Sequence, residues 1–109
     1  MGLAACSQPG TQAPLASAKK LDEATTAISV SCGYAEQVSA FGGPHAPGLA
    51  SLDASAAAGA RKLAAVDARV PTDVYQGETV NQIVSDSVGL LGDCGLAGAQ
   101  RTLQRATSH

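Results

Sequence analysis

This chain has 109 residues, a length that suits a single domain. Its seven Lys and Arg against nine Asp and Glu give a formal net charge of −2 without a basic stripe, which argues against nucleic-acid binding. Alanine supplies much of the 45% hydrophobic content and aromatic residues only 3%, so we expect a thin core that needs an extra covalent constraint.

Near its start the chain contains Leu3-Ala4-Ala5-Cys6, a Cys preceded by two small residues and an aliphatic one. This run resembles the lipobox of bacterial lipoproteins, the cleavage signal in which the Cys sulfur carries a diacylglycerol. Only two residues precede it, where a complete signal has a basic region and then an apolar region of about 7–15 residues. No apolar run in the chain reaches the ~18–20 residues that cross a bilayer as a helix.

The resemblance implies an exported bacterial protein held on a cell membrane or outer membrane by lipid on Cys6, with its domain in the periplasm or the extracellular space. We expect a signal remnant over residues 1–6, a flexible Pro- and Gly-containing tether over 7–15 and a helical domain over 16–107. The alternative is a disordered tail with an incidental Cys.

Hydrophobic periodicity predicts two helices joined by a short turn. The first covers residues 17–41 and ends at Gly42-Gly43-Pro44, since Gly after a helix and Pro beyond it stop the helical hydrogen bonds. The second covers residues 47–70 and is followed by Pro71. Apolar positions recur at three- and four-residue spacing: Leu21, Ala24, Ile28, Cys32, Ala35 and Val38 in the first helix, and Leu49, Leu52, Ala56, Gly59, Leu63, Val66 and Val70 in the second.

A third helix is expected to begin between Thr72 and Thr79. Glycines at 89, 92, 95 and 98 each weaken its helix propensity by about 1 kcal/mol relative to Ala. It therefore either continues to about Ala106 or breaks near residues 92–95 to give a fourth helix. Short loops favour antiparallel neighbours, so the predicted fold is an all-α, up-down-up three-helix bundle, with four helices if the third one breaks. Strand signals are weak throughout.

If Cys6 carries a lipid, Cys32 and Cys94 remain as an even pair in an exported protein, where disulfides persist. In the up-down-up arrangement they lie about equally far along two parallel helices, at nearly equal height. We therefore expect a Cys32–Cys94 disulfide, and the alternative is two buried thiols. Three glycines near these positions are expected to let the two helices approach as closely as a disulfide requires: Gly33, Gly92 and Gly95.

No catalytic, metal or cofactor motif stands out in the sequence. His45 lies in the turn after the first helix and His109 is terminal, and neither belongs to a paired metal-ligand spacing. No serine lies in Gly-x-Ser-x-Gly, and no glycine-rich phosphate loop is present. We expect a protein that is not an enzyme and binds no cofactor or metal.

A second apolar stripe runs along the first helix, formed by Val30, Tyr34, Val38 and Phe41. Each helix of a three-helix bundle touches two others, so the stripe can belong to the core. Alternatively it forms, with Tyr75, a dimer or ligand groove with aromatic anchors. The leading expectation is a membrane-anchored lipoprotein domain with a binding or cell-envelope role, whose partners are membrane lipid and another protein. The alternative is a carrier that holds a small apolar ligand between its helices.

Overall fold

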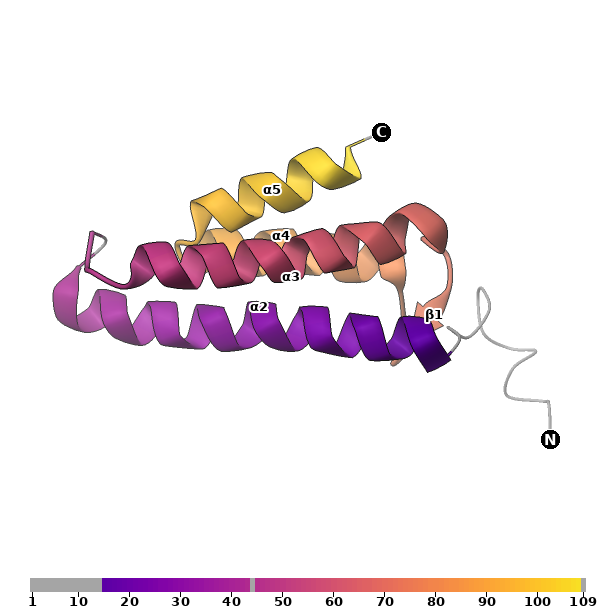
Figure 1. Cartoon of the computed structure of the whole chain (residues 1–109), viewed down its shortest axis with the longest axis horizontal. Helices are drawn as coiled ribbons and strands as arrows, with labels where there is room; N and C mark the ends of the chain where they lie inside the picture. Colours follow the sequence, from indigo (N-terminus) through magenta and orange to yellow (C-terminus); the bar gives the residue numbers. More distant parts are fainter. Residues whose placement is uncertain (1–14, 44, 109) are drawn as a thin grey trace.

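The computed structural model describes residues 15–43 and 45–108, and these form four helices and a small hairpin. The all-α prediction is confirmed, and the helices number four in this part of the chain. The antiparallel pair α2 and α3 packs most extensively, α4 runs parallel to α2 behind them, and α5 folds back along α3 (Figure 1). The elements are α2 (Leu15–Gly42), α3 (Leu49–Arg69), β1 (Val74–Tyr75), β2 (Glu78–Thr79), α4 (Val80–Asp93) and α5 (Ala97–Thr107).

The predicted third helix breaks after Asp93, which decides between the two alternatives that the sequence left open. Gly95 has a φ of +85°, a left-handed conformation that glycine adopts without steric cost. The Leu96 N–H donates to the Leu91 carbonyl at 3.0 Å, as in a Schellman helix end. The chain therefore reverses here, and the last eleven-residue helix, α5, runs back toward the end where α2 begins (Figure 1).

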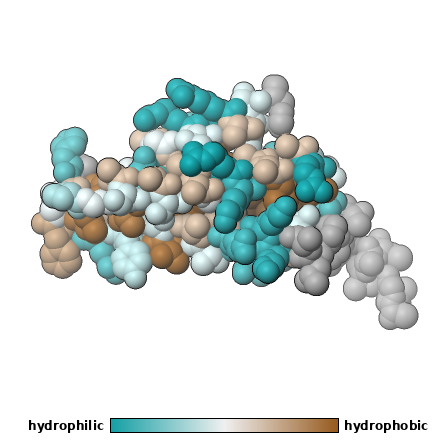
Figure 2. All heavy atoms as spheres, in the orientation of Figure 1, coloured by the Kyte–Doolittle hydropathy of each residue, from teal (hydrophilic) through white to brown (hydrophobic). Residues whose placement is uncertain are grey.

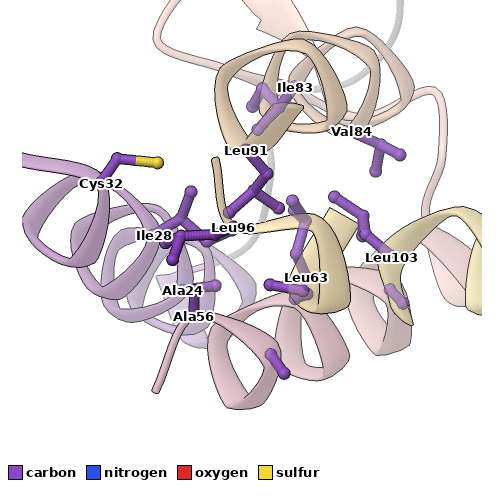
Figure 3. Close-up of a cluster of buried hydrophobic side chains, with 14 of the residues drawn as sticks. Ala24, Ile28, Cys32, Ala56, Leu63, Ile83, Val84, Leu91, Leu96 and Leu103 are labelled. Carbon is purple, nitrogen blue, oxygen red and sulfur yellow. The ribbon is translucent and has the colours of Figure 1, made fainter. Parts of the chain in front are cut away.

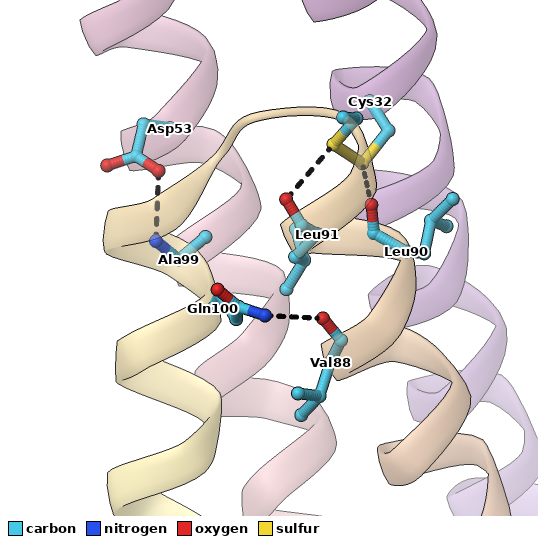
Figure 4. Close-up of a disulfide and its surroundings, with 8 residues drawn as sticks. Cys32, Asp53, Val88, Leu90, Leu91, Ala99 and Gln100 are labelled. Atoms are coloured by element: carbon cyan, nitrogen blue, oxygen red, sulfur yellow. Dashed lines mark hydrogen bonds between the residues drawn. A yellow bond between two sulfur atoms is a disulfide. The ribbon is translucent and has the colours of Figure 1, made fainter.

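Neighbouring helices hold the start of α5 in place. Its N-cap residue, Leu96, has no side-chain acceptor. Instead Asp53 of α3 accepts a hydrogen bond from the Ala99 N–H at 2.9 Å, and the Gln100 side chain donates to the Val88 carbonyl of α4 at 3.1 Å (Figure 4). A methyl group at Gly98 would collide with the Asp53 carboxylate. A side chain at Gly98 would therefore require the Asp53 carboxylate to move away from the Ala99 N–H.

A hairpin that the sequence did not predict precedes α4. Val74 pairs with Thr79 and Tyr75 with Glu78 in an antiparallel register. The two turn residues, Gln76 and Gly77, have φ values of 51° and 84°, the positive pair typical of a two-residue β-turn of type I′. Thr79 then caps α4 in a reciprocal box with Gln82. This fixes the helix start at the later of the two expected places.

Small and aliphatic side chains from all four helices form one core (Figure 3). The helices α2 and α3 approach closely at Gly59, where an added Cβ would lie 3.1 Å from the Ala24 carbonyl oxygen and 3.1 Å from Ala27 Cβ. The larger fully buried apolar side chains are Leu21, Ile28, Leu63, Val80, Leu91, Leu96 and Leu103.

The predicted disulfide between Cys32 and Cys94 is confirmed. It joins the middle of α2 to the residue after α4, with a Cα–Cα distance of 5.4 Å, and both residues are buried (Figure 4). The two sulfur atoms lie 3.7 Å and 3.5 Å from the Leu90 and Leu91 carbonyl oxygens, respectively. Because a disulfide sulfur carries no hydrogen, these are packing contacts.

The role expected for the glycines beside the disulfide is wrong. A Cβ at Gly33 or Gly95 would meet nothing within 4 Å, and one at Gly92 would meet the Gln100 side chain. The physical reason is the position of Cys94 at the end of α4. Since the chain turns away there, the two cysteines can meet without a close approach along the length of both helices.

Candidate binding surface

The apolar stripe on α2 lies on the surface and does not belong to the core. The exposed fractions are 50% for Val30, 56% for Tyr34 and 94% for Phe41, and Val38 is half-buried. The helix packs against α3 and α4, which leaves its opposite side uncovered. Figure 2 shows hydrophobic atoms along the α2 edge of the molecule, mostly toward the α2–α3 turn. We define the α2 face as Val30, Gly33, Tyr34, Gln37, Val38 and Phe41.

Three hollows follow one another along this side of the molecule. The largest, which we call the central groove because it lies beside the middle turns of α2, has a volume of about 640 Å³ and is open to solvent. A hollow of about 290 Å³ lies at Gly33, between Val30 and Gln37, and one of about 530 Å³ lies beside Phe41. The central groove is lined by Asp22, Glu23, Thr26, Ala27, Val30, Ser31 and Tyr34 of α2 and by Leu52 and Ser55 of α3.

One end of the central groove is acidic. Glu23 forms an exposed ion pair with Lys62 of α3 at 4.0 Å, and Asp22 accepts a hydrogen bond from the Tyr75 hydroxyl at 3.3 Å. The floor of the groove, at Ala27 and Leu52, is apolar. An arrangement of this kind suits an apolar side chain inserted from outside, with a polar neighbour at the acidic end.

Tyr75 lies apart from the α2 face, although its hydroxyl contacts Asp22 at the acidic end of the central groove. The β1–β2 hairpin places it beside the first turns of α2, whereas Phe41 lies in the last turn of that helix. Tyr75 lines a separate hollow of about 200 Å³ together with Thr25 and Ile83. Partial burial, the negative charge of Asp22 and their hydrogen bond together raise the pKa of the Tyr75 phenol above 10.0.

A second pair of polar groups lies on the surface near the hairpin. Glu78 and Asp86 share a hydrogen bond, which is the largest cause of a Glu78 pKa above the usual 4.5; desolvation and the Asp86 charge add to it. Within residues 15–43 and 45–108, no three or more His, Cys, Asp or Glu side chains are grouped so that they could hold a metal ion. His45 is exposed in the α2–α3 turn.

The expected lipid site at Cys6 and the tether at 7–14 lie outside the described residues; the tether's last expected residue, Leu15, is the first of α2. None of the helices described is both long and apolar enough to cross a membrane. Comparison of the chain with protein-family models, with curated proteins and with solved structures found no match.

The polar and small residues of this surface were missed at the sequence level. Thr26 and Gln37 line hollows here, and Gly33 lies between Val30 and Gln37. A search for apolar residues passes over all three. The signal that was available is their spacing: positions 26, 30, 33, 37 and 41 continue the three- and four-residue steps of one helix side.

Proposed function

We propose that this chain is an exported bacterial lipoprotein domain, anchored by an acyl chain on Cys6, that acts without enzymatic chemistry by binding a protein in the cell envelope through its α2 face. The observation that carries the binding role is the exposure of Val30, Tyr34 and Phe41 on one side of a helix whose other side supplies the core. Grouped exposed apolar side chains of this kind mark interaction sites on small domains.

The Cys32–Cys94 disulfide supports the export part of the proposal. Structural disulfides persist in the periplasm and outside the cell and are rare in a reducing cytosol. This one lies in the core of the domain. Together with the Leu3-Ala4-Ala5-Cys6 run, it favours a lipoprotein over a cytosolic protein with a chance lipobox.

The placement of the α2 face is compatible with an anchor at the N-terminus. Phe41 lies 26 residues after Leu15, the first residue of α2. At 1.5 Å per residue the two are about 39 Å apart along the helix. A lipid attached ahead of α2 therefore leaves the face accessible to a partner in the same compartment.

A carrier of a small apolar ligand is the second candidate, and the volume of the central groove favours it. About 640 Å³ falls within the range of ligand pockets, roughly 300–1,000 Å³. However, pockets of that kind enclose most of the ligand surface, whereas this groove is open on one side. A protein surface would cover more of it than a small molecule would.

Mass spectrometry of the protein isolated from its own host tests both candidates. We expect an intact mass and an N-terminal peptide that carry fatty acyl groups on Cys6, and a Cys6→Ser variant that lacks them and leaves the membrane fraction. An unmodified Cys6 in membrane-associated protein would contradict the anchor. Native spectra that show a stoichiometric small apolar molecule would favour the carrier instead.

A further inference from the structure

Gly33 lies in the middle of α2 and faces open space. A Cβ added there would meet nothing within 4 Å, and the residue has no positive φ that would require glycine. Glycine inside a helix costs about 1 kcal/mol relative to Ala. Packing within the monomer therefore gives no reason for it, although its neighbours Val30, Tyr34 and Gln37 line a hollow with it. A bare backbone at such a point permits close approach of another molecule.

A projection and a hollow lie on opposite sides of Gly33 along the same helix. Phe41, which is 94% exposed, comes eight residues later. Thr26 and Ala27, in the central groove, come seven and six residues earlier. At 1.5 Å per residue these positions are about 12 Å after and about 10 Å before Gly33. The projection and the hollow are therefore nearly equidistant from the glycine.

We propose that the α2 face docks a second copy of this chain, with the two α2 helices antiparallel and crossing at Gly33. A twofold interface uses the same patch on both copies, so what projects from the patch must fit a hollow elsewhere on it. Here each Phe41 enters the central groove of the other copy, against Thr26 and Ala27. This dimer makes the proposed function more specific, and it rests on that function because it takes the α2 face as a binding surface.

Charge is compatible with this antiparallel pairing. The central groove ends at Asp22 and Glu23, and in this register the segment that approaches that end is the C-terminal part of α2 and the following turn. Residues 37–48 contain no Asp or Glu. The acidic end of each groove therefore meets no carboxylate from the other copy, which avoids the like-charge contacts that oppose association.

The exposed aromatic area is large enough to matter for a dimer. With Phe41 94% and Tyr34 56% exposed, and about 200 Å² for each aromatic side chain, two copies have about 600 Å² to bury from four rings. Specific interfaces bury at least about 1,200 Å² in total. The rings supply about half of this, and Val30, Gln37 and Leu52 lie beside them. We therefore expect a reversible, concentration-dependent dimer.

Sedimentation equilibrium of the oxidised chain tests the proposal, with Cys6→Ser as background so that no disulfide can join two copies. We expect the average mass to rise from monomer toward dimer with concentration. A Gly33→Glu variant places two like charges at the crossing and should raise the dissociation constant at least about tenfold. Gly89→Glu is the matched control, since Gly89 of α4 is equally open and lies off the α2 face.

Mixing charge-reversed copies distinguishes self-association from binding to another protein. Gly33→Glu and Gly33→Lys chains should each be monomeric alone and should form a one-to-one dimer when mixed. Phe41→Ala should weaken the dimer as well, because it removes the ring that enters the central groove of the other copy. Because both glycine variants gain helix propensity, their melting temperatures at high dilution should not fall, so loss of the dimer cannot be attributed to unfolding.

Two results would overturn the second-copy proposal: a wild-type chain that stays monomeric at every concentration, or a Gly33→Glu chain that dimerises as Gly89→Glu does. Either result assigns the α2 face to a different occupant, such as another protein or a lipid surface. Neither affects the proposed anchor, because acylation of Cys6 is measured separately by mass spectrometry.

Discussion

Asp53 of α3 caps the N-terminus of α5, because the N-cap residue of that helix, Leu96, makes no side-chain hydrogen bond to it. Its carboxylate accepts a hydrogen bond from the Ala99 N–H across the α3–α5 interface. The negative charge of an Asp at this position also interacts favourably with the positive end of the helix dipole. Gln100 acts in the other direction by donating to the Val88 carbonyl of α4. Two polar side chains thus connect the last helix to two neighbours.

At the same scale, the Glu78–Asp86 pair should make stability depend on pH. The folded state raises the Glu78 pKa above 4.5, so the folded protein binds a proton more tightly than the unfolded chain does. The stabilisation is fully present below pH 4.5 and is lost as the pH rises through the folded pKa, after which the two carboxylates repel.

We therefore expect Glu78→Gln to raise the melting temperature slightly at pH 7 and to lose this advantage near pH 4. Melting curves at the two pH values measure the effect. Asp86→Asn should behave in the same way, and the double variant should gain little more than either single one. An advantage of Glu78→Gln that is equal at both pH values would contradict the shared proton.

Among the elements, the four helices differ in how readily they could be predicted. For α2 and α3 the sequence was sufficient, because long runs with three- and four-residue apolar spacing allow few other structures. The break after Asp93 was left open, since the glycines of this region look alike in sequence. In the structure Gly95 turns the chain with a positive φ, while Gly92 and Gly98 lie against the Gln100 and Asp53 side chains.

The hairpin and the exposure of the α2 face could not be predicted for different reasons. Strands of two residues, such as Val74–Tyr75, are too short to show alternation. The stripe that includes Tyr34 and Phe41 has a clear period, but whether it is covered depends on how many helices contact α2. That number is a property of the assembled fold and not of the α2 sequence.

The pairing of α2 with α3 depends on the bare surface of Gly59. We expect Gly59→Val to lower the free energy of unfolding by about 1–3 kcal/mol, because its side chain would press on the backbone of α2 at Ala24. Urea unfolding measures this. The matched control is Gly89→Val, where a Cβ meets open space and no loss is expected. Equal stability of the two variants would argue against a close α2–α3 contact.

For the molecule as a whole, the disulfide compensates for the small size of most buried side chains. Many of them are Ala, including Ala24, Ala35, Ala56, Ala60 and Ala99, and each removes little apolar surface from water. Cys32 and Cys94 are 62 positions apart in sequence. Linking them restricts the unfolded chain over more than half of its length. In the chain-entropy account, most of the stabilisation by a disulfide comes from this restriction of the unfolded chain.

Removal of both cysteines should therefore be costly for the whole fold. Cys32→Ser with Cys94→Ser should lose about 4 kcal/mol and melt more than about 10 °C lower. Calorimetry of the oxidised protein, with and without reductant, provides the same comparison without mutation. The Cys6→Ser chain serves as the control and should melt as the wild type does. Identical melting curves for oxidised and reduced protein would show that the link contributes nothing.

The start of α2 and the end of α5 lie at the same end of the bundle (Figure 1). If an acyl chain holds the protein ahead of α2, a fluorescent protein or affinity tag fused after Thr107 would lie at the end of the domain that is nearer to the bilayer. A small label at the α2–α3 turn, near the exposed His45, would lie at the opposite end, and its fluorescence would report the distance of the domain tip from the membrane.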